Sequence, residues 1–145
     1  MALVEKTVLV HHSAEQMFAL VDDIAAYPSF LPWCGGASVD PKEEDGLVHA
    51  TVMIDFHHVK KSFTTENRRE APNLIEMKLV DGPFDILDGS WRFIGLGTDA
   101  CKIEFRLHYE FSNKLLETLV GPIFNMIANS FVDAFAKRAE KVYRK

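Results

Sequence analysis

Two pairs of adjacent histidines are the residues whose side chains most directly suggest chemistry. They are His11-His12 and His57-His58, and imidazole is the commonest metal ligand among protein side chains. In strands, where we expect both pairs, neighbouring side chains point to opposite faces, so neither pair can chelate a metal as a unit. No cysteine or carboxylate pattern with zinc spacing accompanies them. The sequence therefore predicts no metal site.

Nucleophilic catalysis would need a serine or cysteine beside a base that a third group orients. Cys34 and Cys101 lie far apart with no CxxC spacing, and neither they nor any serine lies in a GxSxG-like context. We expect free thiols in a reducing compartment, with a disulfide as the alternative. Ser130 and Arg138 are the only polar side chains expected near the apolar side of the last helix, and solvation or a buried hydrogen bond explains them. No enzymatic activity is expected.

One apolar segment contains two prolines and three aromatic residues: Tyr27-Pro28-Ser29-Phe30-Leu31-Pro32-Trp33-Cys34. The prolines prevent a long regular helix and remove two backbone donors from any sheet. The aromatic side chains make the segment too apolar for an ordinary surface loop. It must therefore either plug the core or cover an apolar cavity, and these residues leave both alternatives open.

Hydrophobic periodicity predicts the elements around this segment. Residues 3–11 alternate as a strand does, and a capping box at Ser13-Ala-Glu-Gln16 then begins a helix with an apolar face. Turn signals divide the chain as far as residue 111 into antiparallel strands; they lie at Glu43–Gly46, Ala71–Asn73, Asp81–Pro83 and Gly95–Asp99.

The last strand and the final helix are the clearest elements. Odd-numbered positions from Cys101 to Phe111 are apolar and the even-numbered ones are polar, which predicts a strand with one buried face. Residues 113–143 change to a helical period, with an apolar stripe that includes Leu116, Leu119 and Phe135. Gly121-Pro122 is expected to kink or split this helix.

This order of elements predicts an α+β fold in which a curved antiparallel sheet wraps around a long C-terminal helix. Such a sheet leaves space against the helix, where a ligand cavity can form. Phe30 and Trp33 are expected to touch a ligand at the cavity entrance. The remaining candidate lining residues could equally be plain core; they are Val52, Ile54, Phe56, Met77, Leu79, Trp91, Phe105, Phe124 and Phe131.

Size and charge narrow the classes of partner. The chain has 145 residues and a net charge of −5, which predicts one domain, residues 1–145, and argues against DNA binding. A patch formed by Lys137–Lys145, Lys60-Lys61 and Arg68-Arg69 could contact RNA, but we expect no aromatic interleaving of the kind that stacks on bases. Neither a signal peptide nor an apolar run of about 20 residues is recognisable. We expect a cytoplasmic protein with at most peripheral membrane contact.

Three blocks of sequence together resemble the coenzyme-Q-binding family of START-like proteins, which have the helix-grip fold of the polyketide-cyclase and Bet v 1-like superfamily. The blocks are Tyr27-Pro28-x-Phe30-Leu31-Pro32-Trp33-Cys34, Gly82-Pro83-Phe84-x-x-Leu87-x-Gly89-x-Trp91-x-Phe93, and Gly121-x-x-Phe124 followed by Ala134-Phe135-x-x-Arg138-Ala139. They run from the first helix to the last, so the resemblance covers essentially the whole chain.

The resemblance implies two functions. Mitochondrial members of the family bind ubiquinone without catalysis and support respiration. Bacterial members are described as ribosome-association toxins that bind the large ribosomal subunit and block subunit joining. No transit peptide is recognisable, as expected of the bacterial branch. Our leading hypothesis is binding of ubiquinone or another prenyl lipid with no required cofactor. Ribosome association is the alternative, and a small cyclase-type enzyme is a third.

Overall fold

The computed structural model describes residues 2–41 and 46–143, and it confirms the predicted helix-grip fold. Seven strands form one antiparallel sheet in the order β1-β7-β6-β5-β4-β3-β2. The strands are β1 (Ala2–Val10), β2 (Cys34–Pro41), β3 (Leu47–Phe56), β4 (Val59–Glu70), β5 (Leu74–Asp81), β6 (Phe84–Gly95) and β7 (Cys101–Phe111). The helices are α1 (Ala14–Asp22), the 3-10 helix η1 (Ile24–Ser29) and α2 (Lys114–Val142).

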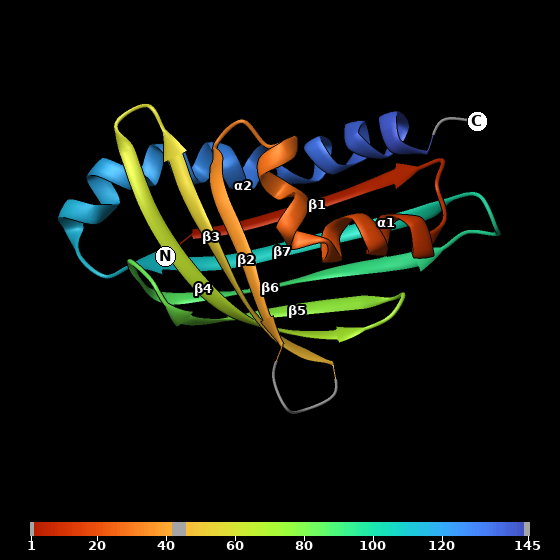
Figure 1. Cartoon of the computed structure of the whole chain (residues 1–145), viewed down its shortest axis with the longest axis horizontal. Coiled ribbons are helices and arrows are strands. Elements are labelled where there is room, and N and C mark those ends of the chain that lie inside the picture. The colour runs from red at the N-terminus through yellow and green to blue at the C-terminus, as the bar shows by residue number, and fades with distance from the viewer. Residues whose placement is uncertain (1, 42–45, 144–145) are drawn as a thin grey trace.

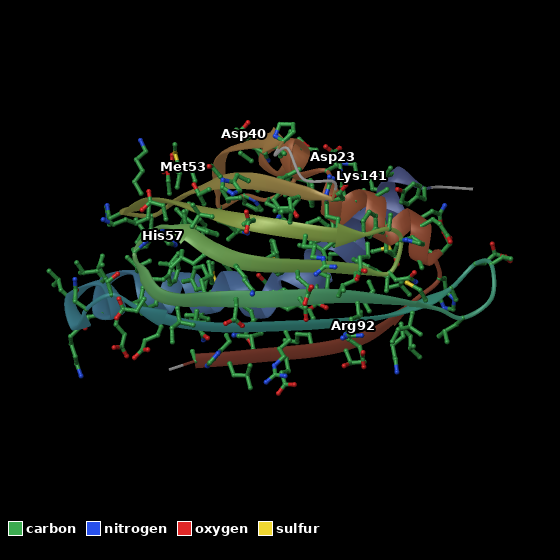
Figure 2. The ribbon with its side chains drawn as sticks, turned by 90° about the horizontal axis from the view of Figure 1, so that it is seen from below. Asp23, Asp40, Met53, His57, Arg92 and Lys141 are labelled. Atoms are coloured by element: carbon green, nitrogen blue, oxygen red, sulfur yellow. The ribbon has the colours of Figure 1, made fainter. Side chains whose placement is uncertain are left out.

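The sheet is strongly twisted, so β2, β3 and β4 run steeply across the direction of β1, β5, β6 and β7 (Figure 1). Figure 2 shows α2 behind the strands, with Arg92 of β6 pointing away from it on the outer face. The buried side chains of the sheet and of α2 therefore face one another across a single core.

The apolar proline segment is held against the end of α1. The predicted capping box is present, because the Ser13 hydroxyl accepts from the Gln16 backbone N–H at 3.1 Å and the Gln16 amide oxygen accepts from the Ser13 N–H at 3.0 Å. The chain leaves α1 at Asp22 and turns again as η1, which contains Tyr27 and Pro28. The Tyr27 hydroxyl donates to the backbone carbonyl of Val21 at 2.5 Å. The segment is thus a short helical turn followed by a loop into β2.

The final strand and helix match most of their predicted pattern. All odd-numbered residues of β7 are buried. The helix α2 begins after Asn113, whose side chain accepts from the Leu116 N–H at 2.9 Å, and it continues through Pro122 without splitting. One prediction for its apolar stripe is wrong, because Leu119 is 60% exposed, whereas Val120, which the predicted stripe also included, is buried. The helical period of 3.6 residues places these neighbours on different faces.

Both histidine pairs lie in turns, not in strands as predicted. His57 and His58 form the hairpin between β3 and β4, and His57 has a left-handed φ of 55°. His11 and His12 lie in the bend after β1. The geometric argument against chelation was therefore wrong, although no three His, Cys, Asp or Glu side chains gather into a metal-binding group within residues 2–41 and 46–143. Most of the turn predicted at Glu43–Gly46 lies outside the described residues.

The helix α2 is long and apolar enough to cross a membrane by length and composition, contrary to the prediction that no segment approaches this. Core helices meet the same criterion, and Phe124, Ile127 and Phe135 of α2 are buried against the sheet. The helix is therefore weak support for a membrane span.

Candidate functional site: an apolar cavity beside a basic groove

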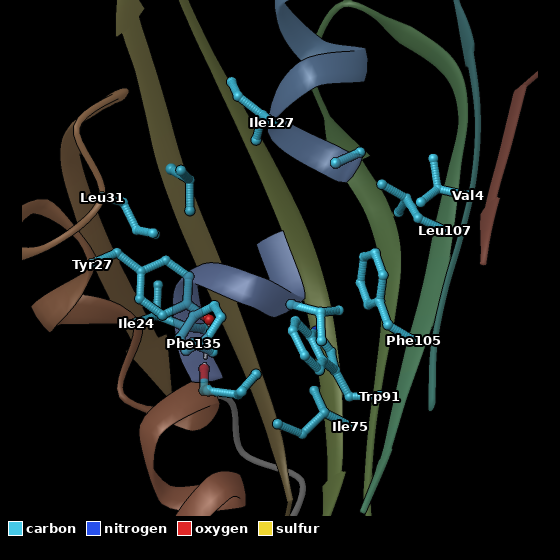
Figure 3. Packing of buried hydrophobic residues seen from close by; sticks show 14 of the residues in the cluster. Val4, Ile24, Tyr27, Leu31, Ile75, Trp91, Phe105, Leu107, Ile127 and Phe135 are labelled. Carbon is cyan, nitrogen blue, oxygen red and sulfur yellow. Dashed lines mark hydrogen bonds between the residues drawn. The ribbon is translucent and has the colours of Figure 1, made fainter. Parts of the chain in front are cut away.

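An internal cavity of about 80 Å³ lies between the inner face of the sheet and α2. In Figure 3, Tyr27 and Leu31 lie on one side of the packed interior, Ile127 of α2 lies beside them, and Phe105 and Leu107 of β7 lie opposite. The lining residues are Ile24, Tyr27, Trp33, Ala50, Val52, Phe63, Thr65, Asn67, Met77, Leu87, Phe105, Leu107, Phe124, Ile127, Ala128 and Phe131. All but Tyr27, Thr65 and Asn67 have side chains without a hydroxyl or amide.

Strand alternation brings these side chains to one face. Ala50 and Val52 of β3 point inward, as do Phe63, Thr65 and Asn67 of β4, while the residues between them point outward. Thr64, for example, makes a 2.8 Å hydrogen bond with Thr51 on the outer face. The lining therefore comes from regular elements whose register the sheet fixes.

The structure divides the predicted ligand-contacting residues into three groups. Those that line the cavity are Trp33, Val52, Met77, Phe105, Phe124 and Phe131. Those that belong to a groove on the surface are Phe30, Trp33 and Phe56. Those that line neither are Ile54, Leu79 and Trp91. Ligand contact by any of them stays a prediction.

Ile54, Leu79 and Trp91 pack outside the cavity lining. The Trp91 ring lies 4.6 Å from the Phe105 ring and 5.5 Å from the Phe135 ring, so neighbouring aromatic side chains fill the space around it. Ile54 is 1% exposed within the core. Leu79 is half-buried, with a side-chain carbon 3.6 Å from where a Cβ on Gly82 would lie. The predicted inward faces of their strands extend beyond the cavity.

The surface groove lies between the loop after η1 and the C-terminal half of α2. It combines Phe30 and Phe56 with Lys137, Arg138 and Lys141, and the Arg138 guanidinium carbon lies 4.9 Å from the Phe30 ring centroid. The prediction of no aromatic interleaving is therefore wrong. Tyr143 lies within the basic cluster in the sequence, and Phe30 and Phe56 join the cluster in the groove from distant parts of the chain.

Trp33 lies between the cavity and the groove and lines both. It is 7% exposed, and its ring lies 5.9 Å from the Phe131 ring in α2. The cavity and the outside groove are thus separated at this point by one indole side chain and its neighbours.

Burial keeps the nucleophilic groups of the interior protonated. It raises the pKa of the Cys34 thiol, and it raises the pKa of Cys101 to about 11 with a smaller contribution from Glu15. Burial, and secondarily the Asp22 carboxylate, also raises the pKa of Tyr27. Both thiols are free, and neither lines the cavity. These three groups are thus neutral at neutral pH.

The polar candidates from the sequence lie outside the cavity. The Ser130 hydroxyl donates to the Ile127 carbonyl at 3.2 Å, and both Ser130 and Arg138 line the surface groove. Of the described lining residues, Tyr27 alone has a titratable side chain, and its hydroxyl is bonded to the Val21 carbonyl. The arrangement can hold an apolar molecule, but it offers no general base.

Thr65 and Asn67 were missed in the sequence. They lie in the polar run Thr64-Thr65-Glu66-Asn67, which is typical of a solvent-exposed strand. The signal that could have found them is their spacing of two and four residues from Phe63, which places all three on one face.

Comparisons with known proteins agree with this architecture. Residues 10–136 match the family described as "Polyketide cyclase / dehydrase and lipid transport". The chain is 46% identical over 143 residues to the ribosome association toxin RatA of Vibrio cholerae, covering 99% of each. It is 30% identical over 135 residues to the mitochondrial coenzyme Q-binding protein COQ10 homolog B of Xenopus laevis, covering 90% of this chain and 55% of that protein.

Solved structures include an enzyme with the same fold. The Zhui aromatase/cyclase of Streptomyces sp. R1128 superposes with a TM-score of 0.80 at 17% identity, covering 99% of this chain and 96% of the other. At this identity the likeness concerns the fold alone. The same fold thus includes proteins named for binding and proteins named for catalysis.

Proposed function

Because this chain belongs to the polyketide cyclase/dehydrase and lipid transport family, with relatives named as ribosome association toxins, we propose that it binds an uncharged apolar molecule without changing it chemically. Ubiquinone or another prenyl lipid is the proposed ligand. The proposal places the protein in the bacterial cytoplasm, where a membrane would be the source of the lipid.

The observation that carries this proposal is the chemistry of the cavity lining. The described lining has no Asp, Glu, His, Lys, Arg or Cys side chain, so a charged ligand would lack a counter-ion and a reaction would lack a general base. An isoprenoid or a quinone ring needs neither. Its binding would depend on burial of apolar area, at about 25 cal/mol per Å².

The size of the cavity adds a requirement. At about 80 Å³ it is well below the roughly 300–1,000 Å³ of typical ligand pockets. A ring-sized ligand therefore requires side chains to move, and Trp33 is the residue whose rotation would join the cavity to the groove. A tail would then leave along Phe30, Phe56 and Met126, which line the groove.

The primary experiment is native mass spectrometry, with lipid extraction, of protein purified from its own host. Recovery of a quinone or prenyl lipid in stoichiometric amount supports the proposal. Protein that is repeatedly empty and does not bind added quinone contradicts it. For the entrance, Trp33→Ala is compared with Trp91→Phe, since the second tryptophan does not line the cavity. Quinone affinity that Trp33→Ala leaves unchanged refutes the role of Trp33.

Ribosome association is the second candidate, supported by the printed names of the bacterial relatives and by the basic side of the groove. Lys137, Arg138 and Lys141 are its cations. Arg69 is not part of this patch, because its guanidinium pairs with the Asp22 carboxylate at 3.0 Å. Binding to ribosomal RNA through such cations would weaken as the salt concentration rises, because the release of counterions from the RNA becomes less favourable.

Co-sedimentation with large ribosomal subunits at several salt concentrations tests this second candidate. The double variant Lys137→Glu/Lys141→Glu is compared with Lys114→Glu, a lysine at the opposite end of the same helix. If the groove contacts RNA, the double variant lowers the slope of log affinity against log salt by about 2, and the control leaves it unchanged. Equal binding of both variants at every salt concentration rejects the groove as the contact.

A further inference from the structure

Two polar side chains stand in the otherwise apolar interior. Thr65 is 6% exposed and Asn67 is 4% exposed, and they are the buried polar residues among those the structure describes. Both line the cavity from β4. The Thr65 hydroxyl donates to the amide oxygen Oδ1 of Asn67 at 2.7 Å. This bond fixes the orientation of the Asn67 amide and does not involve its nitrogen, Nδ2.

Within residues 2–41 and 46–143 the Asn67 amide nitrogen makes no hydrogen bond. The fully enclosed side-chain atom without a partner in these residues is Arg69 Nε, so the Asn67 nitrogen is accessible from the cavity. Buried polar groups are nearly always hydrogen-bonded, and leaving a donor unpaired in an apolar site is unfavourable. Apart from the Tyr27 and Thr65 hydroxyls, the described side chains that line the cavity with Asn67 are apolar and offer no oxygen acceptor. The cavity therefore contains a fixed donor without a partner.

The charge of the surroundings limits what the donor can meet. Arg69 lies two residues further along the same face of β4 and does not line the cavity. Its nitrogen Nη1 donates to both carboxylate oxygens of Asp22, at 3.0 and 3.2 Å. A ligand carboxylate or phosphate would thus be buried without a cation. The matching group is the oxygen of an uncharged carbonyl on an apolar body.

We propose that Asn67 is a ligand-anchoring residue whose side-chain N–H donates to a carbonyl oxygen of an uncharged apolar ligand, with Thr65 as the positioning residue. The inference rests on the proposed function and adds to it, since it selects ketones and quinones over hydrocarbons and over fatty acids. Thr65 acts through Asn67, because its hydroxyl donates to Oδ1 and so fixes the orientation of the amide.

The test uses two probes of similar shape: decylubiquinone, which has ring carbonyls, and decylbenzene, which has none. Each displaces the neutral dye 1,6-diphenylhexatriene from the intact protein, and affinities are compared for wild type, Asn67→Leu, Thr65→Val and Thr64→Val. Thr64→Val is the matched control, because Thr64 is adjacent on β4 but faces outward.

We expect Asn67→Leu to weaken decylubiquinone about 10-fold, which corresponds to about 1.4 kcal/mol, and to leave decylbenzene unchanged or tighter. Thr65→Val should weaken decylubiquinone less, and Thr64→Val should change neither affinity. Equal losses for both probes, or no loss for decylubiquinone, overturn the anchor while the proposed function stands. Failure of the wild type to bind either probe overturns the proposed function itself.

A second measurement avoids reliance on variants that fold poorly. In wild-type protein labelled with ¹⁵N, the side-chain amide signals of Asn67 should shift on addition of decylubiquinone and stay in place with decylbenzene at equal occupancy. The exposed amide of Asn129, whose nitrogen bonds to the Asn125 carbonyl at 2.8 Å, serves as the internal control. Shifts of equal size with both probes contradict the hydrogen bond.

Discussion

Filling the cavity should make the protein more stable and less able to bind a ligand. Ala128 is 2% exposed and lines the cavity from α2, so Ala128→Leu would direct three additional carbon atoms into the empty space. Voids of this kind cost about 24 cal/mol per Å³, and the cavity of 80 Å³ therefore sets an upper bound of about 2 kcal/mol on the gain. Imperfect fit of the new side chain lowers the expected gain to about 1 kcal/mol.

The assay is urea unfolding of both proteins, followed by far-UV circular dichroism, together with dye displacement by decylubiquinone. A gain of about 1 kcal/mol moves the urea midpoint by roughly 0.5 M for a domain of this size. Decylubiquinone affinity should fall at least 10-fold, because the leucine occupies the ligand's place. Ala136→Leu, two turns further along α2 and away from the cavity, has the same change in helix propensity and is the control.

Two results would refute this reasoning. A loss of 1–3 kcal/mol, the usual cost of overpacking, would show that the interior beside Ala128 is solid. A gain in stability with unchanged decylubiquinone affinity would show that the ligand binds somewhere else. The control separates both results from a general effect of leucine on the helix.

Three further predictions concern the frame around the cavity. Asp22→Ala should lower the free energy of unfolding by about 1–2 kcal/mol, because it removes the partly buried carboxylate that accepts two hydrogen bonds from Arg69 Nη1. Glu104→Ala breaks an exposed 3.8 Å pair and should cost less than about 0.5 kcal/mol in the same urea titration. Gly89→Ala would place a Cβ 2.7 Å from a backbone carbonyl of β7 and should lower the free energy of unfolding by about 2 kcal/mol or more. The control Gly36→Ala meets nothing within 4 Å and should change that free energy by less than about 0.5 kcal/mol. Similar losses for the two variants would contradict the close approach of β6 to β7. For Cys101, burial raises the folded-state pKa to about 11, so the stability that the neutral thiol contributes is complete below its unfolded pKa of about 8.5 and is lost as pH rises through the folded pKa. The stability advantage of wild type over Cys101→Ala should therefore shrink by about 3 kcal/mol between pH 8 and pH 12. A constant advantage would refute this titration.

Much of the fold could be predicted because its strongest signals are local. Alternation in β7 and the capping box of α1 each depend on a few neighbouring residues, and both were confirmed. The hairpin at His57-His58 was missed because it contains neither Gly nor Pro, and His57 adopts a left-handed φ. The exposure of Leu119 depends on how α2 rotates against the sheet, which the helical period alone does not specify.

The site was less predictable because its composition depends on contacts between distant segments. Side-chain alternation indicated which faces point inward, but it could not show that Trp91 and Ile54 pack beyond the cavity while Ala50 and Ala128 border it. Small residues border a void because they leave space, so the most informative positions have weak hydrophobic signals. The Phe30–Arg138 contact likewise joins residues far apart in the chain.

The pairing of β1 with β7 has a consequence for how the chain folds during synthesis. Val10 pairs with Cys101 and Ala2 with Tyr109, so the first strand has no partner until the seventh has been made. At the usual rates of translation this delay lasts roughly 5–20 s. The 29 residues of α2, which cover the inner face of the sheet, are made later still. Until then the apolar inner face is open to other chains, so the native state forms only after α2 has been made, and protection by a chaperone would matter most in that interval.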